Sequence, residues 1–117
     1  MKRLLVIDDS EQVREAVHLI LDGKFEISDA SCRAEALNIF KLQRPDYILL
    51  DIEFGAVPEG WEILKEIRQK DREVPIFLMS ANGFYQEHPL VSETNGFIEK
   101  PFSLEAFTKV LNGKEAV

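Results

Sequence analysis

The sequence has few of the features that mark secreted, membrane-spanning or nucleic-acid-binding proteins. It has one cysteine, Cys32, and therefore no disulfide within the chain, which suits a reducing, cytoplasmic compartment. No apolar run approaches the length of a membrane span, and the short N-terminal run leads directly into Asp8 and Asp9, unlike a signal peptide. The formal net charge is −7 and the basic residues are scattered, which disfavours nucleic acid as a partner.

The composition is that of an ordinary globular protein. Hydrophobic residues make up 45% and charged residues 30% of the 117 residues, so disorder and fibrous structure are disfavoured. A chain of this length can bury a core without disulfides. We therefore expect one domain that spans residues 1–117.

Short apolar runs alternate with segments of helical periodicity along the chain. The exception is the stretch from Asn82 to Asn95, where we expect a short or irregular fourth helix. Strict alternation predicts a mainly parallel sheet, with right-handed crossovers and helices on both faces. In the third helical segment, the charged residues predict a solvated face. The apolar runs are Leu4 to Ile7, Phe25 to Ser28, Tyr47 to Leu50, Ile76 to Met79 and Gly96 to Glu99, and the charged residues are Glu62, Lys65, Glu66 and Arg68.

The apolar content of the five runs predicts their order in the sheet. The first, third and fourth runs are continuously apolar, as expected of central strands that are covered on both faces. The second and fifth are shorter and more mixed, as expected of edges. This pattern fits the strand order 2-1-3-4-5 of a doubly wound, flavodoxin-like α/β fold.

Polar side chains follow the predicted strands at one edge of the sheet. Asp8 and Asp9 end the first strand, Asp51 ends the third, Ser80 ends the fourth and Lys100 follows the fifth. These groups should converge, because sites in open α/β sheets lie beyond the carboxyl ends of the strands. Three carboxylates in one pocket repel one another, and their oxygens suit a hard cation such as Mg²⁺. A carboxylate can also attack phosphorus to form an acyl phosphate.

At these positions the sequence resembles the receiver domain of bacterial two-component response regulators. The resemblance covers essentially the whole chain and implies a signalling switch in which Asp51 is the phosphoacceptor. The phosphoryl donor would be a histidine kinase, a phosphotransfer protein or a small acyl phosphate. The carrier is itself modified, so we do not expect an enzyme. The residues that carry the resemblance are Asp8-Asp9-Ser10, Asp51, Gly60 to Arg68, Ser80-Ala81 and Lys100-Pro101-Phe102.

The resemblance also implies roles for residues around the acceptor. The expected ligands of Mg²⁺ or Mn²⁺ are Asp8, Asp9, Asp51 and the backbone carbonyl of Glu53. The expected phosphoryl-binding and switch residues are Ser80, Ala81, Lys100 and the aromatic Phe97. The Lys100–Pro101 bond is expected to be cis. Glu53 and Asn82, which flank the acceptor and the switch hydroxyl, are expected to tune the lifetime of the phosphoryl group.

Two spacings depart from the family pattern. Asp51 and Gly60 are nine positions apart (60 − 51), one more than usual, and Gly55 stands at a position that is usually proline. Ser80 and Lys100 are 20 positions apart (100 − 80), roughly two fewer than usual. These departures motivate an alternative function, a receiver-like protein-interaction module that acts without phosphorylation. They also suggest that the surface through which the domain signals to its partner is unusual.

Several simpler interpretations stay open. Asp8-Asp9-Ser10 could cap the first helix, and Phe97 could be ordinary core. A flavodoxin-type cofactor protein is disfavoured because the first turn lacks a glycine- or serine-rich phosphate cradle. A phosphohydrolase is disfavoured because no acid stands two residues after Asp9. The downstream partner, an output domain in a longer chain and a homodimer are left open.

Overall fold

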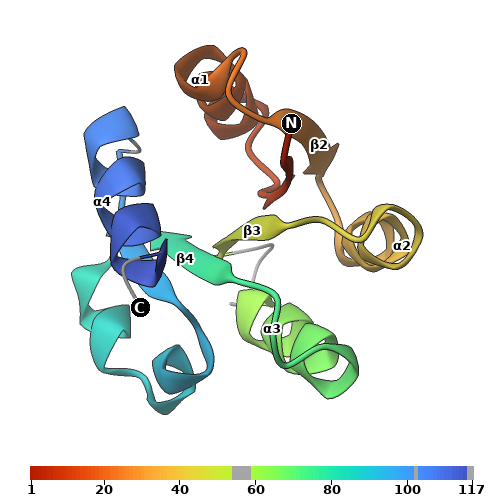
Figure 1. Cartoon of the computed structure of the whole chain (residues 1–117). Helices are drawn as coiled ribbons and strands as arrows, with labels where there is room; N and C mark the ends of the chain where they lie inside the picture. The colour runs from red at the N-terminus through yellow and green to blue at the C-terminus, as the bar shows by residue number, and fades with distance from the viewer. Residues whose placement is uncertain (54–58, 102, 116–117) are drawn as a thin grey trace.

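Five parallel strands form one sheet in the order β2-β1-β3-β4-β5 (Figure 1). The computed structural model describes residues 1–53, 59–101 and 103–115, apart from the side chains of Phe84 and residues 112–115. The predicted class and strand order are confirmed. The loop expected from Phe54 onward lies outside the described residues as far as Pro58, as does Phe102. The strands are β1 (Arg3–Ile7), β2 (Glu26–Ala30), β3 (Tyr47–Asp51), β4 (Ile76–Ser80) and β5 (Gly96–Glu99).

The register of the sheet brings the strand ends level. β3 and β4 are buried along their whole length, and β1 is buried except at Arg3, whereas β2 and β5 are partly exposed edges. The residues that follow β1, β3, β4 and β5 therefore lie along a single edge of the sheet. The pairs that set this register are Ile7 with Leu50, Asp51 with Met79, and Ser80 with Glu99.

Within the described residues, four α-helices cover the two faces of the sheet (Figure 1). One hydrophobic core lies under α1 and α4, and a second lies under α2 and α3. The start of α1 is capped by the Ser10 hydroxyl, which accepts a hydrogen bond from the Val13 amide at 3.2 Å. No helix in the described ranges is both long and apolar enough to cross a bilayer. The helices are α1 (Glu11–Leu21), α2 (Arg33–Gln43), α3 (Gly60–Lys70) and α4 (Leu104–Glu115).

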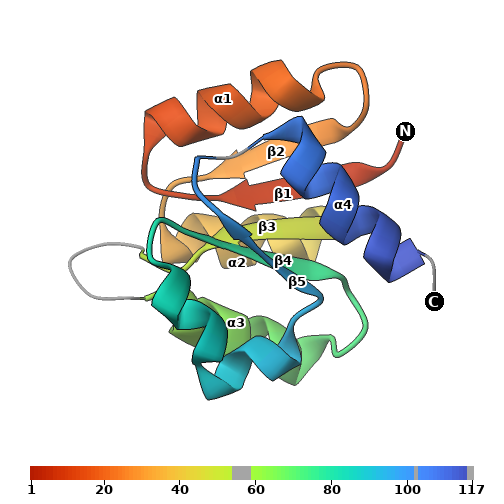
Figure 2. The ribbon, with the colours of Figure 1, turned by 90° about the vertical axis from the view of Figure 1, so that its left-hand side faces the viewer.

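Two short 3₁₀ helices connect β4 to β5, in agreement with the expected irregular fourth helix. They are η1 (Gly83–Glu87) and η2 (Pro89–Glu93), and Figure 2 shows them beside α3. Trp61 of α3 stacks on His88 with ring centroids 3.9 Å apart and meets Tyr85 edge-on at 5.9 Å. Contacts from another element thus hold this connection in place.

Arg68 fastens the same connection to α3. The predicted solvated position was wrong for this residue, which is only 8% exposed. Its guanidinium can be buried because its N–H groups find four oxygen acceptors. These are the backbone carbonyls of Glu93 (2.7 Å), Val74 (2.8 Å) and Asp71 (3.1 Å) and the side-chain carbonyl of Asn95 (3.2 Å).

Gly60 lets α3 begin directly against the end of β3. Its amide donates to the carbonyl of Ile52 at 3.2 Å. A Cβ atom at this position would lie 2.6 Å from the Cα atom of Ile52, which is too close for any larger residue without a backbone shift. Gly60, nine positions after Asp51, is therefore a point of close backbone contact between α3 and the end of β3.

Candidate functional site

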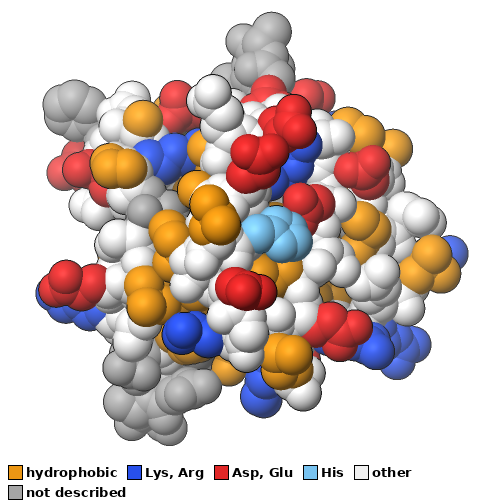
Figure 3. Space-filling model, turned by 90° about the horizontal axis from the view of Figure 1, so that it is seen from above, with side chains coloured by type: hydrophobic (Ala, Val, Ile, Leu, Met, Phe, Trp, Pro, Cys, Tyr) orange, Lys and Arg blue, Asp and Glu red, His pale blue; other side chains and the backbone are white. Residues whose placement is uncertain are grey.

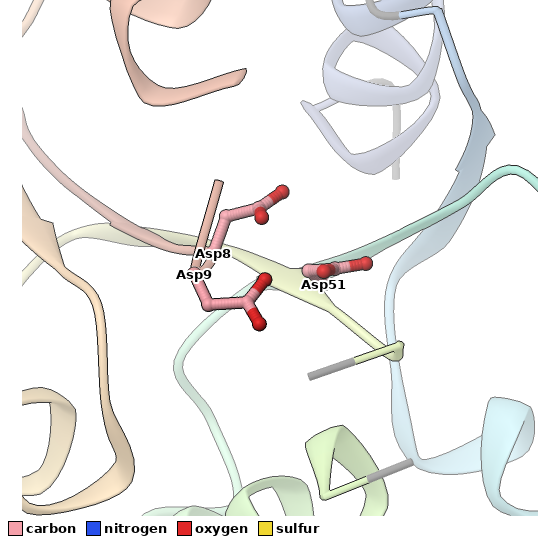
Figure 4. A group of neighbouring side chains, drawn as sticks. All are labelled: Asp8, Asp9 and Asp51. Atoms are coloured by element: carbon pink, nitrogen blue, oxygen red, sulfur yellow. The ribbon is translucent and has the colours of Figure 1, made fainter. Parts of the chain in front are cut away.

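Three carboxylates meet beyond the ends of β1 and β3. Asp8 and Asp51 are buried, at 0% and 2% exposure, whereas Asp9 is exposed. One oxygen from each side chain lies within 4.8 Å of the others, and Figure 4 shows all three pointing into the same space. The structure thus brings together the three acids that the strand order predicted to meet.

Lys100 joins the two buried acids. Its ammonium lies 3.0 Å from Asp8 Oδ2 and 3.2 Å from Asp51 Oδ1. The Lys100 amide donates to the Ser80 carbonyl at 2.8 Å, which ties the residue after β5 to the end of β4. The Lys100–Pro101 bond is cis, the conformation that the resemblance implies. The charged end of the lysine is therefore directed into the acid cluster by the backbone around it.

The charges in this cluster shift one another's proton affinity. Burial, and then the negative charge of Asp8, raise the pKa of Asp51 to about 6, although Lys100 opposes both effects. Burial by itself would lower the pKa of the Lys100 ammonium. Its hydrogen bond to Asp8 and the charge of Asp51 outweigh burial and raise that pKa. The lysine stays charged, and its positive charge does not fully offset the repulsion between the acids.

The donor set fits a divalent, hard cation. Carboxylate oxygens at this spacing are the ligands that Mg²⁺ and Ca²⁺ prefer in proteins. Three carboxylates beside one ammonium leave two negative charges when all are ionised, and one divalent ion would balance them. The raised pKa of Asp51 indicates that a cation at this position would stabilise its ionised form.

A second group of contacts lies at the end of β4. The Ser80 hydroxyl donates to Oε1 of Glu53, and the Ala81 amide donates to the same oxygen at 3.0 Å. The Asn82 amide in turn donates to Ser80 Oγ at 2.9 Å. The Ser80 hydroxyl, opposed only in part by burial, lowers the pKa of the Glu53 carboxyl. The Glu53 carboxylate is thus an anion held on two donors.

Sequence reasoning missed this contact of Glu53. It assigned the backbone carbonyl of Glu53 to the metal and expected Glu53 to tune the lifetime of the phosphoryl group, but it predicted no contact between its carboxylate and Ser80 or Ala81. Both assigned roles stay predictions. The side chain reaches the end of β4, while the Glu53 amide donates to Asp51 Oδ1 at 3.2 Å. An acid two residues beyond the acceptor, opposite the hydroxyl of a neighbouring strand, is the signal that could have indicated the contact.

Arg14 also supports the acid cluster, and it was not predicted. Its guanidinium donates to the backbone carbonyl of Asp8 at 2.8 Å and lies 3.7 Å from Asp29. Asp8 Oδ1 accepts from the Ser10 amide at 2.9 Å. The Asp8-Asp9-Ser10 segment therefore combines the two open interpretations, since Ser10 caps α1 while Asp8 and Asp9 belong to the cluster.

A groove opens beside the cluster. The groove has a volume of about 450 Å³ and adjoins Lys100. On the face seen in Figure 3, acidic, basic and hydrophobic side chains are interspersed. The groove is lined by Gln12, Val13, Ala16, Ala81, Lys100 and Pro101.

Phe97 is partly buried in β5 and packs against the core under α2 and α3. The predicted role of Phe97 as a switch residue stays a prediction.

The sequence matches a known protein family over most of its length. Residues 4–112 match the response regulator receiver domain. The chemotaxis protein CheY of Halobacterium salinarum is 31% identical over 117 aligned positions, which cover 94% of this chain and 97% of that protein. Some relatives are longer: the response regulator MprA of a Mycobacterium species is 29% identical, and the match covers 88% of this chain but 46% of MprA.

Solved structures give the same result. The response regulator TrrA of Thermotoga maritima, determined in complex with Mg²⁺ and beryllium fluoride, has a TM-score of 0.86 at 30% identity, covering 97% of this chain and 98% of TrrA. TrrA has also been solved in complex with the histidine kinase ThkA, where the match has a TM-score of 0.83 at 29% identity and covers 97% of each chain. The likeness therefore extends over the whole fold.

Proposed function

Because the chain belongs to the response regulator receiver domain family, we propose that it is a phosphoacceptor switch of a two-component system with Asp51 as the acceptor. One observation carries the proposal. Asp51 is a buried carboxylate at the end of a central strand, 3.2 Å from the ammonium of Lys100 and clustered with Asp8 and Asp9. Burial and nearby cations are how proteins prepare a carboxylate for reaction with a phosphoryl group.

The chain's own residues divide the chemistry between them. A carboxylate oxygen of Asp51 attacks phosphorus and forms a P–O bond, while the P–N bond to the donor imidazole breaks and its electron pair stays on nitrogen. Lys100 offsets the charge of the phosphoryl oxygens as a point charge. The Ser80 hydroxyl and the Ala81 amide are the donors proposed to bind those oxygens in the phosphorylated protein.

Asp8, Asp9, Asp51 and the carbonyl of Glu53 would hold Mg²⁺ or Mn²⁺. When bound, the ion would offset negative charge on the carboxylates and on the phosphoryl oxygens. Two observations support this assignment, the spacing of the carboxylate oxygens and the excess of two negative charges over Lys100. TrrA, a relative with this fold, was solved with Mg²⁺ and beryllium fluoride.

The proposed partners follow from the same chemistry. A histidine kinase or phosphotransfer protein would present its phosphohistidine at the edge where Asp51 lies, and the groove beside Lys100 offers an adjacent surface. The complex of TrrA with ThkA supports a kinase as the partner class. We infer that residues 1–117 form one receiver domain that works in the cytoplasm and changes a partner-binding face, with Ser80 and Phe97 as the moving groups.

Phosphorylation of Asp51 has a direct test. Incubation with acetyl phosphate and Mg²⁺ should add the mass of one phosphoryl group to the wild-type protein, and Asp51→Asn should abolish the gain because an amide cannot form the acyl phosphate. Asp22→Asn, which removes an acid at the exposed end of α1, is the matched control and should be phosphorylated like the wild type. An equal mass gain in the Asp51→Asn variant would assign the modification elsewhere.

The alternative is an interaction module that works without phosphorylation. The contact of Glu53 with Ser80 and Ala81 favours it, because an anion already lies on two donors in the unmodified chain. Partner affinity with and without beryllium fluoride separates the two functions. Equal affinity would support the alternative, and a change of severalfold would reject it.

A further inference from the structure

The Glu53 side chain bridges the ends of two neighbouring strands. Glu53 follows β3, while the two groups that donate to its Oε1 atom, the Ser80 hydroxyl and the Ala81 amide, lie at the end of β4. Glu53 is largely exposed, and these contacts direct its carboxylate to the end of β4. Its own amide is held separately, on Asp51 Oδ1 at 3.2 Å.

These contacts use all the hydrogens that the two donors have. A serine hydroxyl has one hydrogen, and a backbone amide has one. The Ser80 hydrogen is directed at Glu53, because an ionised carboxylate can only accept, and the Ser80 oxygen itself accepts from the Asn82 amide at 2.9 Å. The Ala81 hydrogen is directed at the same carboxylate oxygen. Neither donor can serve a second anion while Glu53 is in place.

We propose that the Glu53 carboxylate occupies the phosphoryl-oxygen subsite of the unmodified protein and competes with the phosphoryl group for it. The inference rests on the proposed function, in which Ser80 and Ala81 bind phosphoryl oxygens. A carboxylate oxygen and a phosphoryl oxygen accept the same hydrogen bonds, so one can replace the other on these two donors. Glu53 is thus a specificity-determining residue that sets how readily the site accepts an anion.

The covalent geometry of Glu53 allows the exchange. The side chain can turn away into solvent while the amide keeps its hydrogen bond to Asp51, so the acceptor need not move. Both charges are negative, so a phosphoryl group and the Glu53 carboxylate would repel each other if both stayed in the subsite. Acceptance of a phosphoryl group therefore requires the glutamate to leave.

Competition predicts that removal of the glutamate tightens anion binding. The probe is beryllium fluoride at saturating Mg²⁺, titrated by calorimetry with the full chain. Glu53→Ala should bind the probe about tenfold tighter or more, since a charge-assisted competitor is lost. Glu53→Gln keeps an oxygen acceptor but loses the charge, so its affinity should lie between those of the wild type and Glu53→Ala. Glu62→Gln, which removes an exposed acid of α3, should match the wild type.

A second readout reports on the subsite itself. The backbone amide proton of Ala81 should move upfield in the NMR spectrum of unmodified Glu53→Ala, because its hydrogen bond to the carboxylate is gone, and should move back downfield when beryllium fluoride binds. In Glu62→Gln this resonance should stay at its wild-type position. A purely structural role of Glu53 would predict weaker, not tighter, binding of the probe.

The outcomes distinguish the inference from the proposed function. If the wild type binds beryllium fluoride and Glu53→Ala binds no tighter, the inference is overturned and the phosphoacceptor function stands. If neither protein binds the probe, the proposed function fails and the inference fails with it. Binding by Glu53→Ala alone, or tighter binding by it than by the wild type, supports both.

Discussion

The connection after β1 and the connection after β4 leave the same edge of one sheet but are stabilised differently. After β1, an amphipathic stripe and the Ser10 cap produce the 11-residue helix α1. After β4, two 3₁₀ helices of five residues each are held by side chains of α3. Local sequence encodes the first connection, whereas the second depends on contacts with residues distant in the chain.

The two regions also differ in how their polar groups are satisfied. At the end of β1, the carboxylates of Asp8, Asp9 and Asp51 exceed the charge of Lys100, and a bound cation would balance the excess negative charge. At the end of β4, Ser80 and Ala81 are satisfied from within the chain by Glu53. In the unmodified protein, the charge near β1 is therefore left unbalanced, whereas the hydrogen-bond donors near β4 already have an acceptor within the chain.

The largest expected effect tests the dependence of the second connection on α3. Arg68→Ala should lower the free energy of unfolding by about 3 kcal/mol, because the carbonyls of Glu93 and Val74 lose a buried donor. Chemical denaturation measures the loss. Hydrogen exchange should quicken at residues 83–95 well before it quickens in α1. Arg72→Ala, at an exposed position near the end of α3, is the control. If hydrogen exchange quickened equally at residues 83–95 and in α1, the two connections would not differ in their dependence on α3.

The next effect tests the excess charge near β1. The pKa of Asp51 is about 6 in the folded protein, above its ordinary value of 3.8, so its contribution to stability is fully present below the ordinary value. That contribution is lost as the pH rises through about 6. Without metal and above pH ~7, Asp51→Asn should therefore be more stable than the wild type by at most about 3 kcal/mol.

The same experiment contains its own controls. The difference between Asp51→Asn and the wild type should vanish near pH ~3 and below, where the acid is mostly protonated in both the folded and unfolded states. Mg²⁺ should raise the melting temperature of the wild type more than that of Asp51→Asn, because a carboxylate ligand is missing from the variant. A wild type that is more stable than the variant in metal-free buffer at neutral pH would contradict the charge argument.

The smallest effect tests the local encoding of α1. Ser10→Ala should cost about 1 kcal/mol of unfolding free energy, because the Val13 amide loses its side-chain acceptor. Ser10→Thr keeps a hydroxyl and should cost less. Urea denaturation resolves both changes. If Ser10→Ala destabilises as much as Arg68→Ala does, the two connections do not differ in the way that their contacts indicate.

Much of the fold could be predicted because burial leaves a direct trace in the sequence. Strands such as Tyr47–Asp51 are covered on both faces and so appear as unbroken apolar runs, which identified the centre of the sheet. Once the order was known, the acids after two neighbouring central strands had to meet. The sequence alone therefore groups Asp8, Asp9 and Asp51, and the structure places them together.

What could not be predicted depends on individual side-chain contacts between distant residues. Arg68 has the composition of a solvated helix face, and only the carbonyls of Val74 and Glu93 explain its burial. Glu53 was expected to act near the acceptor, but no periodic pattern indicates that its side chain reaches Ala81. Such contacts depend on how two connections approach each other, which apolar periodicity does not encode.

The close approach of Gly60 to Ile52 has a consequence for how this domain tolerates change. The hydrogen bond between them joins the start of α3 to the residue after β3, so the two ends of this connection are fixed against each other. When the ends of a connection are fixed, one additional residue adds only about 0.1 kcal/mol of closure entropy. A change in the length of the chain between Ile52 and Gly60 should therefore leave the helix and the acceptor strand in their positions.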